Sequence, residues 1–204
     1  MSFLFQNITS LYNVIFINIK IFLIKIILKK KIVFFYHPKK KLTKNNLTLI
    51  NKYFSKKKNY YFIYGSTLIV YKDNFFLIKQ SYLKFLHGID LFLSNNVSDK
   101  FTPKSIKVYI HHDIYDTPLV EKSKEKKLLT KLKEYDFIVV ATKDSKKVFE
   151  NLFNKNKNIK IVVYKYLKID YILKKIKGRK TKQTKTILIA PTNYLGFPKI
   201  SMQS

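Results

Sequence analysis

Short apolar runs alternate with polar, amphipathic segments along most of this chain, and this alternation limits the possible folds more than any other feature. Runs rich in β-branched and aromatic residues predict strands at 31–36, 60–64, 89–93, 107–110, 137–141 and 159–164. Residues 68–78 also have strand character. Helical spacing is found at 42–54, 81–87, 121–134 and 144–153. Because strands that alternate with helices are typical of βαβ units, the sequence predicts an α/β fold, a Rossmann-like parallel sheet with helices on both faces.

Two local signals mark where predicted helices begin and end. Gly88 directly follows the 81–87 segment, and glycine is the usual residue at a helix stop. Thr142 and Asp144 stand at the start of the 144–153 segment, where either side chain can cap the first backbone N–H groups.

The most apolar stretch, residues 11–28, lies near the amino terminus. Its thirteen aliphatic or Phe side chains favour membrane insertion by about 4 to 8 kcal/mol, whereas Lys20 and Lys25 oppose it by about 2.5 to 3.5 kcal/mol each. The sum is close to zero, although the length would just permit a span. On a helical wheel, Asn13, Asn18 and the two lysines fall within about 160°, which leaves a broad apolar arc opposite them.

We therefore predict that residues 1–30 form an amphipathic helix on the membrane surface, with lysines that reach into the headgroup region. Lys29, Lys30 and Lys31, followed by three more lysines at 39–41, would attract an anionic leaflet. This places the protein peripherally on the cytoplasmic face of the cell membrane. The alternative is an ordinary core helix. A cleaved signal peptide is not expected, because no basic segment precedes the apolar run.

The charge of the chain is strongly positive and unevenly distributed. Lys and Arg number 41 against 12 Asp and Glu, a net charge of +29, and no acidic residue occurs before Asp73. Such a charge attracts nucleic acids. However, Arg179 is the only arginine, whereas base and phosphate recognition favour the arginine fork, and a codon bias toward lysine would give the same composition. Nucleic acid is therefore not the expected partner.

Two absences in the sequence exclude several chemistries. The chain has no Cys, which excludes disulfides, thiolate metal sites and cysteine nucleophiles. It has four Gly and neither of the common Gly-rich phosphate loops, so no nucleotide cofactor is expected.

One cluster of titratable residues follows the predicted strand at 107–110. His111, His112, Asp113 and Asp116 lie within six residues, at a carboxyl strand end where open parallel sheets bind ligands. An imidazole there can take a proton from a hydroxyl while a carboxylate fixes its tautomer. Because neighbouring residues of an extended segment face opposite ways, only one of the two histidines is expected to be the base. A structural role for both stays open, and a metal site is not predicted.

The end of the chain predicts a change of domain. Residues 174–185 form a basic connector around Gly178, and 186–190 begin another strand with fourteen residues after it. We predict an acceptor domain at 31–173, a linker at 174–185 and the start of a truncated donor-binding domain at 186–204. The alternative is that the last strand is an edge strand of one complete sheet.

The order of these segments resembles that of the CDP-glycerol glycerophosphotransferases. A His-bearing turn follows a central strand, then come DFIVVATKDSKKVFENLF, a linker and ILIAPT, and the likeness covers roughly residues 31–195. In that family a Trp-His-Gly turn and a Thr-Pro-Leu segment hold the proposed base; this chain has Thr117, Pro118 and Leu119 but neither the Trp nor the Gly. The resemblance implies His112 as the base, His111 as the second choice, Asp113 beside them, and Asp116 and Thr117 as acceptor-binding residues.

The resemblance also implies a fold and a reaction. The fold would be the N-terminal, acceptor domain of a two-domain GT-B transferase. The reaction would transfer glycerol phosphate from CDP-glycerol to a hydroxyl of a phosphate-rich polymer or glycan at the cell surface, as in teichoic acid biosynthesis. Because the family's donor contacts lie in the other domain, we expect no transferase activity from these residues alone. The alternatives are a nucleotide-sugar glycosyltransferase of the same architecture, a basic nucleic-acid-binding protein and a nonfunctional remnant of a truncated gene.

Overall fold

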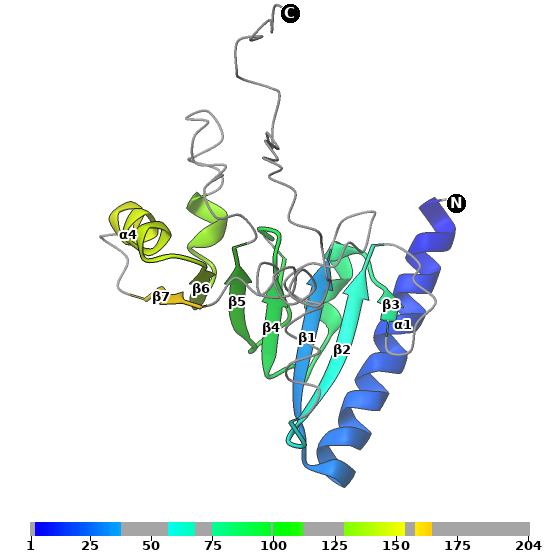
Figure 1. Cartoon of the computed structure of the whole chain (residues 1–204). Helices are drawn as coiled ribbons and strands as arrows, with labels where there is room; N and C mark the ends of the chain where they lie inside the picture. The colour runs from blue at the N-terminus through cyan, green and yellow to red at the C-terminus, as the bar shows by residue number, and fades with distance from the viewer. Residues whose placement is uncertain are drawn as a thin grey trace, which may run out of the picture.

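The computed structural model of the chain describes residues 3–37, 57–67, 75–98, 100–111, 129–153 and 158–164. Its centre is one sheet of seven parallel strands (Figure 1). In chain order these are β1 (Lys31–His37), β2 (Tyr60–Ser66), β3 (Phe75–Leu77), β4 (Leu91–Ser94), β5 (Ile106–Ile110), β6 (Phe137–Val140) and β7 (Lys160–Val163). Their order in space is β3-β2-β1-β4-β5-β6-β7. The predicted parallel α/β sheet is confirmed.

Strand β1 lies inside the sheet, between β2 and β4, and is covered on both sides. Residues 32–37 are all buried, as expected for a continuous apolar run in a parallel sheet. In the strand register Phe34 lies beside Ile63 of β2 and Phe92 of β4. The rings of Phe34 and Phe92 stack with their centroids 6.0 Å apart. Aromatic residues on adjacent strands therefore pack across the middle of the sheet.

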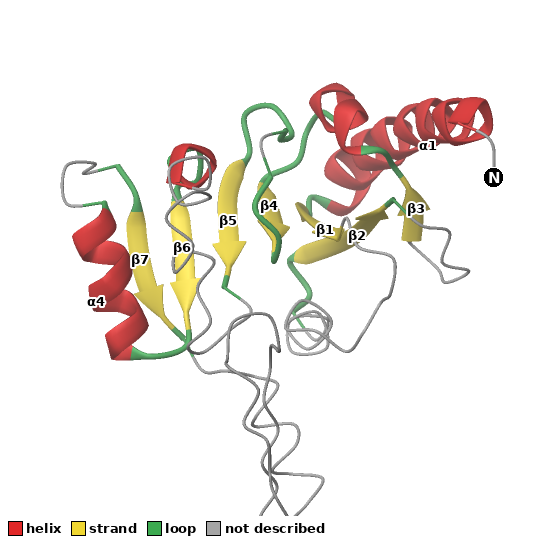
Figure 2. Ribbon diagram, turned by 90° about the horizontal axis from the view of Figure 1, so that it is seen from above, coloured by secondary structure: helices red, strands yellow, loops and turns green. Residues whose placement is uncertain are grey.

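The described helices pack on one face of the sheet (Figure 2). A buried cluster joins α1 (Phe3–Leu23) to the central strands through Val14, Ile17, Ile21, Phe34 and Phe92. On the same face a second cluster joins α4 (Lys143–Leu152) to β5 and β6 through Tyr109, Ile138 and Phe149. The opposite face carries a third cluster, made of Val33, Phe35, Leu93, Val108 and Ile110. The helix predicted at 42–54 lies outside the described residues.

Two helices can be compared with their predicted bounds. Within the predicted range 1–30, α1 begins at Phe3, and a π-helical turn, η1 (Ile24–Leu28), continues it to Lys29, whose φ of 49° ends the helix. The predicted 81–87 helix is a 3₁₀ segment, η2 (Gln80–Phe85). Gly88 follows it with a φ of 73°, as the stop signal predicts. A Cβ atom at Gly88 would also come within 2.9 Å of Cγ2 of Ile21, which shows how closely α1 approaches this turn.

The remaining predictions can be compared element by element. Thr142 caps α4 as expected, because its Oγ1 accepts a hydrogen bond from the backbone N–H of Ser145 at 3.0 Å. The strand character at 68–78 is found in β3, while residues 68–74 lie outside the described part. Residues 129–132 are helical, within the predicted 121–134 helix. The predicted linker at 174–185 and the segment 186–204 also lie outside the described residues.

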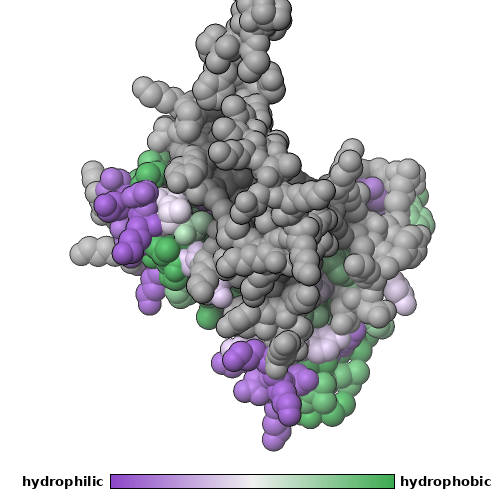
Figure 3. All heavy atoms as spheres, in the orientation of Figure 1, coloured by the Kyte–Doolittle hydropathy of each residue, from purple (hydrophilic) through white to green (hydrophobic). Residues whose placement is uncertain are grey.

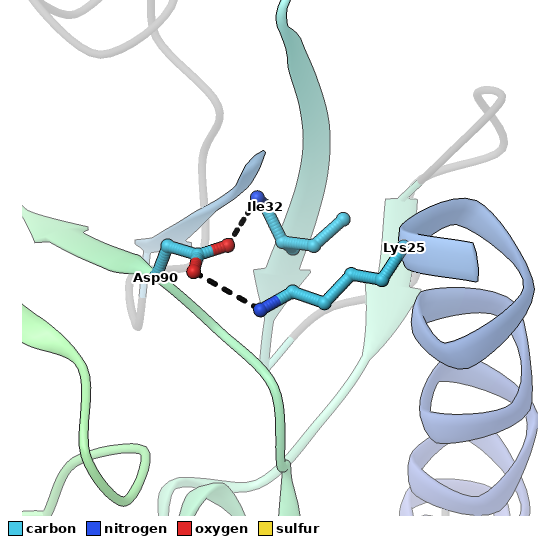
Figure 4. Close-up of polar contacts among 3 residues, drawn as sticks. All are labelled: Lys25, Ile32 and Asp90. Carbon is cyan, nitrogen blue, oxygen red and sulfur yellow. Dashed lines mark hydrogen bonds and ion pairs between the residues drawn. The ribbon is translucent and has the colours of Figure 1, made fainter. Parts of the chain in front are cut away.

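Two aspartates make equivalent pairs of hydrogen bonds to a neighbouring strand at the amino edge of the sheet. Just before β4, Asp90 accepts the N–H of Ile32 on Oδ2 at 2.7 Å (Figure 4). The backbone N–H of Asp90 donates to the Ile32 carbonyl at 3.0 Å. Just before β6, Asp136 makes the same pair of bonds with Lys107, at 2.7 and 3.0 Å. Asp90 has one addition, because Nζ of Lys25 lies 3.0 Å from its Oδ1. This ion pair ties the end of the N-terminal helix to the sheet.

Candidate functional site

The carboxyl ends of the central strands meet at one edge of the sheet, where parallel α/β folds bind their ligands. The chain leaves β1 toward β2 on one side and returns with β4 on the other, so the strand order reverses between β1 and β4. His37 ends β1, Ser94 ends β4, and His111 directly follows β5. Two of the four histidines of the chain are thus described at this edge.

His37 and Asn95 form a buried polar pair at the reversal point. His37 is 8% exposed and Asn95 5% exposed, and Nδ1 of the imidazole lies 3.0 Å from Oδ1 of the amide. The same oxygen accepts a hydrogen bond from Nδ2 of Asn96 at 3.0 Å. Because Oδ1 can only accept, Nδ1 of His37 carries its proton, and in the neutral ring Nε2 is the accepting nitrogen. An imidazole with this tautomer can receive a hydrogen bond or a proton from a hydroxyl.

A short turn after β4 holds Asn95 and Asn96 in place. The hydroxyl of Ser94 donates to the carbonyl of Asn96 at 2.7 Å and accepts from the Asn96 N–H at 3.2 Å. Serine side chains commonly stabilise such turns by bonding the backbone two residues on. The imidazole of His37 is therefore oriented by a turn that is itself fixed by hydrogen bonds.

Tyr64 lies on the same face of the sheet as His37 and near the same edge. Its ring stacks on Phe75 at 4.4 Å and on Phe35 at 5.2 Å between centroids. Burial raises the pKa of the Tyr64 hydroxyl above its ordinary value, and the described residues include no hydrogen-bond partner for it. Tyr64 is therefore a protonated phenol near neutral pH and can donate a hydrogen bond but cannot act as a base.

His111 faces the other side of the sheet and belongs to the core. It is 2% exposed, its ring lies edge-on to Phe149 at 5.3 Å between centroids, and Nδ1 is 3.4 Å from the hydroxyl of Tyr109. Its backbone N–H donates to the Val139 carbonyl at 2.9 Å, which continues the β5–β6 ladder for one residue. A side chain packed in this way supports the fold of the edge and has little access to a substrate.

The predicted site is thus described in part. Its first residue, His111, is at the expected strand end, whereas His112, Asp113, Asp116 and Thr117 lie outside the described residues. The pair of His37 and Asn95 was not predicted. The signal that could have found it is positional: His37 directly follows one strongly apolar run, Asn95 lies two residues after another, and these two runs form neighbouring central strands.

Two other features of the described residues bear on the chemistry. No three His, Asp, Glu or Cys side chains within the described ranges come close enough to hold a metal ion. A shallow hollow of about 480 Å³ lies at the amino edge of β5, β6 and β7, and its lining includes Lys104, Asp136 and Lys160. This hollow is at the edge opposite His37 and His111, and the Asp136 carboxylate already bonds the backbone of Lys107. The carboxyl edge is therefore the better candidate site.

Comparisons with known proteins show a similarity at the level of the fold. No protein-family model matches the chain, and no curated protein sequence matches it significantly. Among solved structures, the fold is similar to that of the wall teichoic acid polymerase TagF, solved as a histidine-to-asparagine variant, with a TM-score of 0.50 and 14% sequence identity. The match covers 83% of this chain and 48% of the TagF chain, so this chain spans about half of that structure. The sheet described above therefore has the fold of part of a GT-B transferase.

Proposed function

We propose that this chain carries the acceptor site of a glycerophosphotransferase that uses CDP-glycerol. The observation that supports it best is the location of the His37 imidazole at the carboxyl edge of a sheet whose fold is similar to that of TagF. His37 lies at the reversal point, and the segment that begins at His111 leaves the same edge. A donor that presents a diphosphate would also suit a chain with a net charge of +29.

The proposed reaction is an in-line displacement at phosphorus. An acceptor hydroxyl of a glycerol-phosphate chain attacks the β-phosphorus of CDP-glycerol, and its proton passes to the imidazole of His112. The new bond joins the acceptor oxygen to the β-phosphorus, and the bond from that phosphorus to the bridging oxygen breaks, so that CMP leaves. Base assistance of this kind contributes about 10² to 10⁴ in rate. In this scheme His37 positions the acceptor, because Asn95 fixes its tautomer.

The four histidines allow a direct test of where the acceptor binds. A short glycerol-phosphate oligomer would be titrated into the protein while the imidazole resonances are followed by NMR. We expect saturable shifts at His37 and His112. His87 is the internal control, because it is exposed and lies before β4 at the opposite edge of the sheet. Shifts confined to His87, or no saturation, would argue against an acceptor site at the carboxyl edge.

The chemical step is tested by the release of CMP from CDP-glycerol in the presence of the oligomer and of the donor half of a glycerophosphotransferase. His112→Asn is expected to lower the rate of release by about 10² to 10⁴. His37→Asn is expected to raise the KM for the acceptor more than it lowers kcat. An equal rate for wild type and His112→Asn would remove His112 from the proposed mechanism.

A further inference from the structure

The hollow of about 480 Å³ at the amino edge of β5, β6 and β7 is lined by both apolar and cationic side chains. Ile106 at the start of β5 is 50% exposed, and Phe137 at the start of β6 is half-buried. Lys104 precedes β5 and Lys160 begins β7, so the two lysines come from either side of β6. The hollow therefore offers two ammonium groups beside an apolar surface.

Lys104 is held in a backbone conformation that lysine rarely adopts. Its φ of 56° lies in the left-handed region, which favours Gly and, less often, Asn or Asp. Pro103 and Lys104 are the central residues of the turn that leads into β5. A turn with Pro at its second residue and a positive φ at its third usually has Gly at that third position. Strained residues of this kind cluster at binding sites, which makes the hollow beside Lys104 a candidate.

Buried hydroxyl groups fix the turn that carries Lys104. Oγ1 of Thr102 donates to Oγ of Ser105 at 2.7 Å, and Oγ of Ser105 donates to the Thr102 carbonyl at 3.0 Å. These two residues are the first and last of the turn, and they are 1% and 7% exposed. Lys104 is therefore placed beside the hollow before a ligand arrives, which lowers the entropy cost of binding.

The other side of the hollow is fixed by the sheet. Nζ of Lys160 lies 5.8 Å from the ring centroid of Phe137, a cation–π contact. The Lys160 N–H donates to the Asp136 carbonyl at 2.9 Å, and Oδ2 of Asp136 accepts the N–H of Lys107 at 2.7 Å. A carboxylate can accept further hydrogen bonds, and so can the exposed amide of Asn158. The negative charge of Asp136 opposes a ligand that is only an anion and favours one that also carries hydroxyl groups.

The hollow is separate from the other surfaces of the domain. The apolar segment Leu4–Leu28 is long enough to cross a bilayer, and α1 contacts β3 at one edge strand of the sheet, whereas β7 is the other edge strand. Figure 3 shows apolar surface along the lower part of α1 and hydrophilic surface over α4 and β7, on opposite sides of the view. His37 lies at the carboxyl edge. A ligand in the hollow would therefore leave both α1 and the candidate acceptor site free.

We propose that this hollow binds a phosphate ester of a polyol. The phosphate lies between the ammonium groups of Lys104 and Lys160, since lysine is a common phosphate ligand. The hydroxyl groups bond to Asp136 and Asn158, and the carbon chain packs on Phe137. A free polyol phosphate and one unit of a polymer share this chemistry. The inference goes beyond the proposed transferase reaction and does not depend on it.

The location can be tested by titrating glycerol 3-phosphate into the protein while the backbone amides are followed by NMR. At about 0.15 M salt, where attraction between distant exposed charges is screened, we expect saturable shifts at Ile106, Phe137 and Lys160. Inorganic phosphate and glycerol each carry only part of the ligand, so both should bind more weakly. Saturable shifts confined to Asn95 and Asn96 would instead place the ligand at the carboxyl edge and overturn the proposal.

Two matched pairs of variants separate this site from the general positive charge of the chain. Lys104→Gly and Lys160→Ala should each weaken binding about two- to fivefold, the range for an exposed ion pair, and the double variant about four- to twenty-five-fold. Lys29→Gly is the control for the first, because Lys29 also has a positive φ, of 49°. Lys84→Ala is the control for the second, because Nζ of Lys84 also lies over a phenylalanine ring, 4.9 Å from the centroid of Phe85.

The control double variant has the same net charge and should bind like wild type. Neither glycine substitution should lower the melting temperature, because glycine adopts a positive φ without strain. Equal weakening by both double variants would mean that the chain attracts phosphate without a site. Equal affinities for inorganic phosphate and glycerol 3-phosphate would remove the polyol from the proposal.

A short glycerol-phosphate oligomer distinguishes the two sources of the ligand. Tighter binding of the oligomer at these amides would identify a unit of a polymer, and tighter binding of glycerol 3-phosphate would identify a free polyol phosphate. Both results support the site. None of these measurements uses CDP-glycerol or the donor half of an enzyme, so a failure of the proposed transferase reaction would leave them unchanged.

Discussion

The carboxylate of Asp90 joins three elements, and its removal should be costly. In Asp90→Ala the N–H of Ile32, a residue with no exposed surface, loses a charged acceptor at 2.7 Å. A hydrogen bond to a charged group contributes about 1.5 to 3 kcal/mol. The ion pair with Lys25 adds about 0.2 to 1 kcal/mol, because both side chains are more than a third exposed, at 37% and 38%. We therefore expect Asp90→Ala to lower the free energy of unfolding by about 2 to 4 kcal/mol.

Two further variants separate these contributions. Lys25→Met removes the ion pair and keeps the hydrogen bond to Ile32, so it should cost less than about 1 kcal/mol. Asp136→Ala removes the equivalent hydrogen bond to Lys107, at a more exposed position and without an ion pair among the described residues. It should cost about 0.5 to 1.5 kcal/mol.

The assay is urea unfolding followed by far-ultraviolet circular dichroism, with all four proteins in the same buffer. The order of stability should be wild type, then Lys25→Met, then Asp136→Ala, then Asp90→Ala. If Asp90→Ala lowered the free energy of unfolding no more than Asp136→Ala does, the burial of the Ile32 N–H would add nothing to the loss. If Lys25→Met cost as much as Asp90→Ala, the ion pair would be the main contribution.

Three other substitutions probe the core and a helix cap by the same assay. Gly65→Ala would place a Cβ atom 2.4 Å from Cζ of the buried Phe34, so we expect a loss of about 1 to 3 kcal/mol; an unchanged stability would mean that the ring has room to move. Ile17→Ala, at a fully buried position of α1, should cost about 2 to 5 kcal/mol, and a small cost would mean that α1 contributes little to the core. Thr142→Ala should cost about 0.5 to 2 kcal/mol, whereas Thr142→Ser keeps the capping hydroxyl and should cost much less.

The strands were predictable because their signal is local. The run before His37 is apolar on both faces of the strand. The inner strands of a parallel sheet need this pattern because both of their faces are buried, and β1 is such a strand. The 3₁₀ form of η2 was not predictable, since its residues have ordinary helical spacing. The contacts that hold the start of α1 were not predictable, because Asn7 and Ser10 bond Lys79, which is distant in sequence.

The candidate site was harder to predict than the fold because it depends on strand order. His111 could be placed at a strand end from its neighbours, but its burial against Phe149 depends on where α4 packs. His37 gains its role from Asn95, which follows a strand that is fourth in the chain and adjacent in space. The helical wheel of α1 correctly separated Asn13 and Asn18 from the apolar arc. It could not show that the sheet, and not water, satisfies these amides.

The direction of α1 has a consequence for how a long substrate could reach the protein. The helix runs beside β2 and β3 and opposite to them, so its amino-terminal end lies near the edge that carries His37 (Figure 1). A bilayer in contact with the helix would hold β2 and β3 parallel to the membrane surface. The carboxyl edge that carries His37 would then face along that surface. An extended acceptor of the kind proposed above would then enter parallel to the leaflet.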